Sequence, residues 1–332
     1  MNRVEGVFPW TLSDITSREF DLFIAMIGYE RRARFVAQNF NVRARRCVAY
    51  AFREQRVESF RKNWQWYQNA GFDVKEVTGA ELQDECAALV RGLLYETDRP
   101  LRVCVDISST TRIRIAAILA ALITLPRGPA IEVDFLYAPA KYTPPPRHMS
   151  QIETAGPILP RYAGWSNEPD QPVTAVFGLG YEYDKAVGTV EFVEPAQVWA
   201  FQASGRDARY AEEGRKANEF FWRTLPQERC ITYSVDRPFD CFISLESLVF
   251  GILTDSRPLL VPFGPKLFTL CCLLVAEVHF PSVAVWRVTS GSSDPAVDRA
   301  PDGSVVGLRV LLVPADAAEV RGGSEAAAVE AV

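Results

Sequence analysis

Several residue patterns that indicate common enzyme classes are missing from this sequence. The chain has only two histidines, His148 and His279, and its seven cysteines form no CxxC pair. His148 lies in a proline-rich stretch and His279 near the end of an apolar helical pattern, so neither falls in a candidate loop. Histidine-based triads and metal clusters are therefore disfavoured, and no metal site is predicted. We expect the cysteines to be reduced core residues of a cytosolic protein.

Long hydrophobic runs are also missing. The longest apolar stretches, Ile115–Leu125 and Leu267–Val275, are shorter than a membrane-spanning helix and are expected to be buried helices. The first ten residues, MNRVEGVFPW, lack the apolar run of a signal peptide. We therefore predict a cytoplasmic protein with no membrane association.

The sequence has no excess of positive charge and no complete nucleotide-binding fingerprint. Its formal net charge is −5, which gives no global case for nucleic-acid binding. Neither G-x-G-x-x-G nor a Walker lysine motif is present, so ordinary NAD binding is disfavoured. The 332 residues, 48% hydrophobic and 23% charged, are typical of a globular protein with two domains.

The two halves of the chain repeat the same order of segments. The stretches FIAMIGYE (23–30) and VFGLGYE (176–182) are both apolar runs that end in Gly-Tyr-Glu before a helical pattern. An apolar strand follows in each half, CVAYAF (47–52) and QVWAFQ (197–202). The amphipathic helices that come next carry Arg61-Lys62-Asn63 and Arg215-Lys216-Ala217-Asn218.

The remaining segments continue this correspondence. In order, the paired segments are the strands Phe72–Val77 and Cys230–Val235, the helices Leu82–Leu94 and Phe242–Leu253, the strands Leu101–Asp106 and Pro258–Pro262, the helices Thr111–Leu125 and Pro265–Glu277, and the strands Ile131–Tyr137 and Ser282–Val288. Strands that alternate with helices at this spacing predict parallel βαβ units. We predict an α/β fold of two Rossmann-like, doubly wound parallel-sheet domains related by internal duplication.

The expected domains are 1–142 and 173–314. The proline-rich segment 143–172 is predicted to be a linker or extended strap, and the Ala/Glu/Gly-rich tail 315–332 is predicted to be disordered. Val305–Val313 is expected to add a sixth strand to the second domain.

Ligands of open parallel sheets bind at the carboxyl ends of the strands, where the strand order reverses. For the common order 3-2-1-4-5, this point lies between strands one and four. The candidate ligand-binding residues of these loops are Tyr29, Glu30, Asp106, Ser108, Ser109, Thr110 and Arg112 in the first half, and Tyr181, Glu182, Gly264 and Lys266 in the second.

The residues after the fourth strands indicate an anion site. In the first half, Asp106-Ile107-Ser108-Ser109-Thr110-Thr111-Arg112 opens a helix, and a helix N-terminus with hydroxyls and an arginine favours phosphate. Lys266 supplies the charge at the same place in the second half. A simple N-cap explains one hydroxyl equally well. Glu30 and Glu182 either favour the helix dipole or accept from a ribose or base, while the adjacent tyrosine stacks.

The first half also contains a local cluster of positive charge. It comprises Arg31, Arg32, Arg34, Arg43, Arg45, Arg46, Arg53, Arg56, Arg61 and Lys62. Such a cluster is either a solvated face or a surface for a polyphosphate, a nucleic acid or an acidic partner protein.

A strand followed by a Ser/Thr-rich loop with a basic residue and an apolar helix resembles the signature loop of CARF domains, the Rossmann-like sensors of cyclic oligoadenylates in type III CRISPR systems. Two copies in one chain are also similar to SAVED domains, the cyclic-nucleotide sensors of CBASS antiphage systems. The resemblance covers Asp106, Ser108, Ser109, Thr110 and Arg112, and in the second half only Gly264 and Lys266. The typical glycine pair of the family is replaced by serine and threonine here. The resemblance implies a regulatory protein of prokaryotic antiviral defence with a nucleotide or cyclic oligonucleotide as ligand.

We therefore expect a non-catalytic protein that binds a nucleotide-like anion, with no other cofactor evident. Two alternatives stay open. The first is an enzyme acting on a nucleotide or nucleoside, with Asp106 and Glu30 as its polar catalytic groups. The second is a scaffold subunit that binds an effector protein or nucleic acid through the Arg31–Lys62 region.

Overall fold

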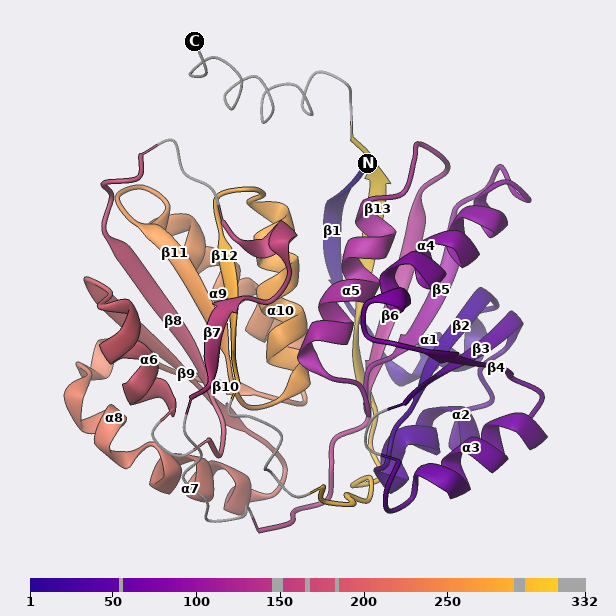
Figure 1. The fold of residues 1–332 in the computed structure, drawn as a ribbon, viewed down its shortest axis with the longest axis horizontal. Helices are drawn as coiled ribbons and strands as arrows, with labels where there is room; N and C mark the ends of the chain where they lie inside the picture. Colours follow the sequence, from indigo (N-terminus) through magenta and orange to yellow (C-terminus); the bar gives the residue numbers. More distant parts are fainter. Residues whose placement is uncertain (54–55, 145–151, 165–167, 183–184, 290–295, 316–332) are drawn as a thin grey trace.

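The computed structural model describes residues 1–53, 56–144, 152–164, 168–182, 185–289 and 296–315. Two β-sheets, each flanked by helices, form the two halves of the molecule (Figure 1). Both sheets consist mainly of parallel strands, and the architecture is Rossmann-like, so the predicted α/β fold class is confirmed.

The first sheet has seven strands in the order β1-β13-β6-β5-β2-β3-β4. Their bounds are β1 (Asn2–Pro9), β2 (Phe20–Ile27), β3 (Ala44–Phe52), β4 (Asp73–Val77), β5 (Leu101–Asp106), β6 (Ile131–Tyr137) and β13 (Val306–Pro314). The strands β4, β3, β2, β5 and β6 lie side by side in the sheet and are parallel. Numbered among themselves by their order in the chain, they have the order 3-2-1-4-5. Every residue of β2 is buried, as expected for a central strand covered on both faces.

The second sheet repeats this parallel order. Its strands run β10-β9-β8-β11-β12-β7. Their bounds are β7 (Thr154–Pro157), β8 (Val173–Leu179), β9 (Gln197–Ser204), β10 (Cys230–Ser234), β11 (Arg257–Pro262) and β12 (Ala284–Thr289). Strands one and four are therefore neighbours in both halves, as β2 with β5 and as β8 with β11.

The helices follow the predicted alternation with strands. Those of the first half are α1 (Leu12–Ser17), α2 (Phe35–Asn39), α3 (Phe60–Asn69), α4 (Glu81–Leu94) and α5 (Arg112–Ile123), and those of the second are α6 (Lys185–Val193), α7 (Ala208–Ala217), α8 (Glu219–Thr224), α9 (Pro238–Ile252) and α10 (Lys266–Val278). Short 3₁₀ turns span Arg31–Arg34, Pro160–Tyr162 and Gln227–Arg229.

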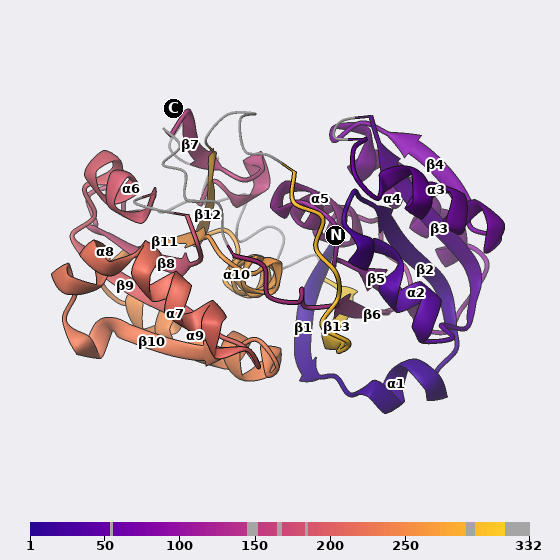
Figure 2. The same ribbon diagram turned by 90° about the horizontal axis from the view of Figure 1, so that it is seen from below.

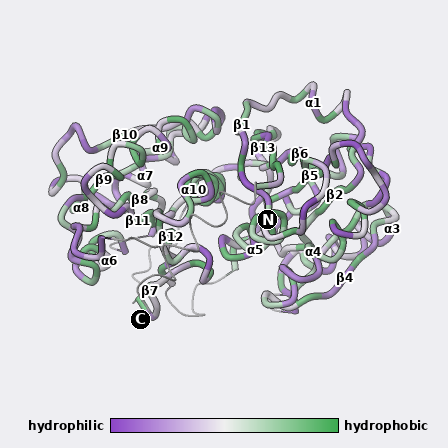
Figure 3. The backbone as a smooth tube through the Cα atoms, turned by 90° about the horizontal axis from the view of Figure 1, so that it is seen from above, coloured by the Kyte–Doolittle hydropathy of each residue, from purple (hydrophilic) through white to green (hydrophobic). Residues whose placement is uncertain are grey.

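One hydrophobic core connects the two halves. The helices α5 and α10 are apolar on nearly all sides, and a helix of this kind must be covered all round. Each packs on its own sheet and against the other, and α9 and α10 also pack against β1. Figure 2 shows α10 beside β1 and β13, and Figure 3 shows it as a mainly hydrophobic segment near the middle of the molecule. The halves are thus held together by buried apolar surface.

The strand β13, the last within the described residues, joins the first sheet. The sequence-based expectation that Val305–Val313 extends the second half was wrong, because β13 pairs antiparallel with both β6 and β1. Its residues Val306, Leu308, Val310 and Leu312 are buried in the core shared by both halves. The strand β1, which was not predicted, completes this edge.

The described part of the segment 143–172 includes a strand and a short 3₁₀ turn. Its strand β7 pairs antiparallel with β12, so it forms the edge of the second sheet. Arg161 donates to both carboxylate oxygens of Glu277 in α10 at 2.7 Å, and Tyr162 is buried. His148 and the tail beyond Ala315 lie outside the described residues.

The placement of β13 predicts a large effect of truncating Leu308. The side chain of Leu308 is fully buried in the shared core, whereas that of Leu311 on the same strand is only partly buried. We expect Leu308→Ala to lower the free energy of unfolding by about 2–5 kcal/mol, since it leaves a cavity. Urea denaturation of the matched variant Leu311→Ala should show a clearly smaller loss. Equal, small losses would contradict the described position of β13.

Candidate functional site

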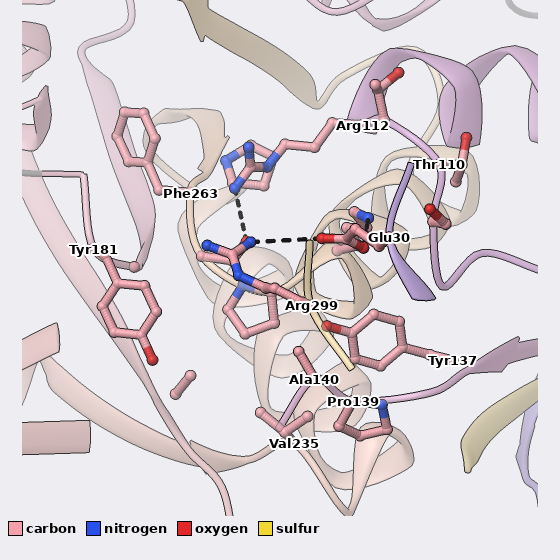
Figure 4. A pocket seen from close by; sticks show the side chains of 18 of the residues that line it. Glu30, Thr110, Arg112, Tyr137, Pro139, Ala140, Tyr181, Val235, Phe263 and Arg299 are labelled. Atoms are coloured by element: carbon pink, nitrogen blue, oxygen red, sulfur yellow. Dashed lines mark hydrogen bonds and ion pairs between the residues drawn. The ribbon is translucent and has the colours of Figure 1, made fainter. Parts of the chain in front are cut away.

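A cavity lies where the parallel strands of both sheets end. Its volume is about 970 Å³, and residues at the carboxyl ends of β2, β5, β6, β8, β9, β11 and β12 line it (Figure 4). The two candidate crevices predicted from sequence therefore open into one shared space. The predicted residues that line it are Tyr29, Glu30, Ser109, Thr110, Arg112, Tyr181, Glu182, Gly264 and Lys266.

Two predicted residues, Asp106 and Ser108, lie behind the cavity wall. Ser108 donates to the Oδ1 atom of Asp106 from both its hydroxyl and its backbone N–H, and the Ser108 hydroxyl accepts from the Ala138 N–H at 2.8 Å. Both side chains are buried, and burial raises the pKa of Asp106 to about 6. They shape the loop after β5, so they are positioning residues and not part of the cavity surface.

The loops after strands one and four touch each other in both halves. A Cβ atom on Gly28 would lie 2.0 Å from the Ser109 Oγ, and one on Gly180 would lie 2.4 Å from the Gly264 Cα. The loops after strands one and four thus close the predicted crevice in each half. The cavity lies instead between the two halves.

A buried asparagine holds each Gly-Tyr-Glu loop. Asn63 donates from Nδ2 to the carbonyl oxygens of Gly28 and Glu30, both at 2.9 Å. Asn218 donates in the same way to Gly180 at 2.8 Å. The repeated Arg-Lys and Asn pattern in the sequence contained this signal, although the sequence alone did not show what the asparagines bind.

Basic residues at the starts of α5 and α10 reach across to the opposite half. Arg112 donates from Nη2 to the Glu182 Oε1 at 3.0 Å and to the Gly264 carbonyl at 2.7 Å. Lys266 donates to the Ser108 carbonyl at 2.8 Å, and its Nζ lies 3.8 Å from the Glu30 Oε2. Each half therefore supplies a cation to the other half's strand-one glutamate and strand-four loop.

Glu30 is a buried carboxylate surrounded by cations. It is 4% exposed, and the Nε of Arg32 donates to its Oε2 at 2.6 Å. The guanidinium of Arg299 approaches its other oxygen to 3.7 Å, as Figure 4 shows. Burial alone would raise the pKa of Glu30, but Lys266, Arg32 and Arg299 outweigh it and hold the pKa below its ordinary value. Glu30 is therefore ionised at neutral pH.

The pKa of Lys266 is lowered, whereas an ion pair with a carboxylate ordinarily raises the pKa of a lysine. Burial lowers its pKa to about 7, although Glu30 opposes the shift. Arg32, Arg299 and Arg112 add to the lowering, because each destabilises a further positive charge. The amine thus changes its charge close to neutral pH.

Stacked tyrosines line the cavity on the side of the second half. The rings of Tyr181 and Tyr210 are 5.7 Å apart with 22° between their planes, and Tyr142 meets Tyr210 edge-on at 5.3 Å. The Tyr210 hydroxyl donates to the Ala140 carbonyl at 2.9 Å. Of these three residues, only Tyr181 was predicted, because Tyr142 and Tyr210 lie outside the loops after strands one and four.

Positive charge predominates in the described lining of the cavity. Nine of these residues are Lys or Arg and five are Asp or Glu. Sequence reasoning missed Arg287 and Arg299, and it assigned Arg32 to a surface cluster although Arg32 is 3% exposed. The excess of cations favours an anionic ligand.

Five other arginines of the Arg31–Lys62 region form ion pairs with carboxylates. Ion pairs join Arg31 to Asp298, Arg43 to Glu19, Arg45 to Glu96, and both Arg53 and Arg56 to Glu76. These pairs lower the net charge that the region would present to a partner.

Within the described part of the chain, no cluster of three His, Cys, Asp or Glu side chains could hold a metal ion. The described helices also include none that is long and apolar enough to cross a membrane.

The titration of Lys266 predicts a pH-dependent effect on stability. In the unfolded chain the amine keeps its proton up to about its ordinary pKa of 10.5, but in the folded protein it loses the proton near 7. The unfolded state thus binds more protons between these pH values, and this contribution to stability rises with pH. We expect the stability of Lys266→Met relative to the wild-type protein to fall from pH 7 to pH 10, by at most about 1.4 kcal/mol per pH unit. Exposed Lys62→Met is the control, and a pH-independent difference for Lys266→Met would contradict the assignment.

The contact between the second-half loops predicts a cost of adding a methyl group at Gly180. Gly180→Ala would press a Cβ into the backbone of Gly264. We expect this to lower the free energy of unfolding by about 1–3 kcal/mol, as overpacking does. In the control Gly251→Ala, the added Cβ in α9 meets nothing within 4 Å. Thermal unfolding should leave this control at least as stable as the wild-type protein; similar losses in the two variants would disprove the loop contact.

Comparison with known proteins gives no family assignment, since neither a family model nor a curated protein matches the chain. Among solved structures, a geranyl diphosphate methyltransferase in complex with GPP and sinefungin aligns at a TM-score of 0.23 and 10% identity, over 91% of this chain and 74% of that one. A coclaurine N-methyltransferase bound to N-methylheliamine and SAH aligns at 0.20 and 8%, over 91% and 69%. Similarity this low supports no conclusion about activity.

Proposed function

We propose that this chain binds one anionic, nucleotide-like small molecule in the cavity between its halves, as a sensor or regulatory protein. The observation that carries the proposal is the excess of Lys and Arg over Asp and Glu in the described lining, nine against five, in a chain of net charge −5. Positive charges gathered in a concave site with low-dielectric walls attract and concentrate anions. A volume of about 970 Å³ lies at the upper end of the range for small-molecule sites.

Phosphate groups of the ligand would meet the helix starts that face the cavity. Arg112 is the first residue of α5 and Lys266 the first of α10, so their charges add to the positive ends of the two helix dipoles. Arginine is also suited to phosphate because its planar guanidinium can donate two parallel hydrogen bonds.

The rest of the lining suits a base and a sugar. The stacked Tyr181 and Tyr210 provide an aromatic surface against which a flat ring can pack. The Glu182 Oε2 atom is buried and has no hydrogen-bond partner among the described residues, so a ligand hydroxyl would satisfy it.

The proposal also covers the evolutionary origin of the two halves and the biological role of the protein. Internal duplication accounts for the equal strand order, the asparagine anchors and the reciprocal cations of the two halves. A sensor in prokaryotic antiviral defence, as the resemblance to CARF and SAVED domains implies, is the biological role that we propose.

The first test is native mass spectrometry of the purified protein, followed by denaturing extraction and identification of any bound small molecule. Binding of the extracted compound, or of ATP and a dinucleotide when none is recovered, is then measured by calorimetry. We expect Arg112→Ala and Lys266→Ala each to weaken binding roughly 10- to 100-fold, because each removes a charge-assisted contact. Exposed Arg46→Ala is the control. Unchanged binding by both cavity variants would disprove the proposal.

Lys266 supports one second candidate, an enzyme acting on a nucleotide. An amine that titrates near neutrality and lies 3.8 Å from a carboxylate can transfer a proton to or from a bound ligand. Of the two catalytic groups predicted from sequence, Glu30 lines the cavity and Asp106 does not reach its surface. Recovery of an added nucleotide unchanged after prolonged incubation argues for the sensor, and its conversion argues for the enzyme.

A further inference from the structure

The two halves differ in the side chain that lies beside the end of strand one. In the second half this residue is Gln202 of β9, which pairs with Leu179, and Ala51 of β3 holds the corresponding register position in the first half. Gln202 lines the cavity. We infer that Gln202, with Tyr181 and Tyr210, forms a subsite for a ribonucleoside. This inference rests on the proposed function and assigns the uncharged part of the ligand to the second half.

Gln202 carries a buried hydrogen-bond acceptor that the described chain leaves unsatisfied. The residue is 5% exposed, and its Oε1 atom has no hydrogen-bond partner among the described residues. Its Nε2 atom donates to the Ala203 carbonyl at 3.2 Å, which orients the amide. A buried acceptor without a partner costs free energy, and an N–H or O–H group of a ligand would satisfy it. Ionised phosphate oxygens are acceptors and would not, so this side chain suits the nucleoside and not the phosphates.

A glycine leaves room for this amide next to the tyrosines. Gly214 of α7 lies one helical turn after Tyr210 and therefore on the same face of the helix. A Cβ atom on Gly214 would lie 2.8 Å from the Gln202 Nε2 and 3.7 Å from the Gly180 carbonyl oxygen. Tyr181, which follows Gly180, stacks on Tyr210. The amide and the aromatic surface are thus neighbours, where α7 packs against the loop after β8.

A second unsatisfied acceptor lies on the same loop. The Oε2 atom of Glu182 is buried and unpartnered within the described chain, and a Cβ atom on Gly180 would collide with it. Two acceptors beside an aromatic surface match a flat group that carries hydrogen-bond donors. A ribonucleoside has such donors in the amino group of its base and in the hydroxyls of its ribose.

The first half, within its described residues, has no amide at the corresponding place. Ala51 has no polar side-chain atom. The residue one turn before the anchoring Asn63 is Ser59, where the second half has Gly214. The Ser59 hydroxyl donates to the Asp298 Oδ2 at 2.8 Å, so this position is already occupied by a contact within the chain. The nucleoside is therefore assigned to the second half alone.

Calorimetry of the full chain with ATP, and with pyrophosphate as a probe that lacks the nucleoside, tests this subsite. We expect Gln202→Leu to weaken ATP binding roughly 5- to 30-fold and to leave pyrophosphate binding unchanged, because it removes a contact with the nucleoside only. Gly214→Ala should have the same effect, since its Cβ displaces the amide. The control Gly251→Ala adds the same methyl group where it meets nothing within 4 Å, and should bind both probes like the wild-type protein.

Three ATP analogues identify the donor that meets Gln202. The 2′-deoxy and 3′-deoxy forms each lack one ribose hydroxyl, and purine riboside triphosphate lacks the amino group of the base. The analogue without the relevant donor should bind to the wild-type protein about as weakly as ATP binds to Gln202→Leu, and Gln202→Leu should not weaken it further. Such a loss with any of the three supports the subsite, and equal binding of all three and ATP contradicts it.

Three further results would overturn the subsite. The first is wild-type affinity for ATP in both Gln202→Leu and Gly214→Ala. The second is equal weakening of ATP and pyrophosphate by Gln202→Leu, because a nucleoside contact cannot act on pyrophosphate. The third is binding of ATP to the wild-type protein no tighter than that of pyrophosphate. Each leaves the proposed anion site standing if pyrophosphate binds and Arg112→Ala weakens it, and the compound extracted from the purified protein decides the proposed function if neither probe binds.

Discussion

The packing of α5 against α10 is the constraint on which the site depends. Each helix begins directly after the fourth strand of its half, so their side-by-side packing brings two helix N-termini to one cavity. Because Arg112 and Lys266 are the first residues of these helices, each reaches the strand-one glutamate of the opposite half. The buried apolar surface between the halves thus determines how far Arg112 and Lys266 lie from the strand-one glutamates.

Charge in this cavity is balanced unevenly, and the imbalance gives the two halves different chemistry. Glu30 remains ionised in a buried position because three cations surround it. Glu182 is more exposed and has one bonded cation. Similar loops in similar folds have therefore produced a buried carboxylate among three cations on one side and a more exposed ion pair on the other.

The sequence was sufficient to predict the parallel strands, their order and most of the loops at the site. The Gly-Tyr-Glu repeat located strand one, and the switch-point rule then pointed to Arg112 and Lys266. It could not assign Arg287 or Tyr210, because a single arginine in a strand or a single tyrosine in an amphipathic helix has no distinguishing spacing. Nor could it tell that Ser108 faces Asp106 instead of the cavity, since consecutive residues of a loop need not face the same way.

The local sequence pattern could not predict which sheet β13 joins, for a different reason. A strand with alternate buried residues fits the edge of either sheet, and only the packing of the whole chain selects one. Its pairing with β1 and β6 means that a strand synthesised after the second sheet completes the first sheet. While the chain emerges from the ribosome, the first sheet lacks an interior strand and leaves the edge of β6 unpaired until the second sheet and β13 have been made. The two halves have separate sheets, but the first sheet needs a strand that is encoded after the second half. A message truncated after the first half therefore cannot encode a finished sheet.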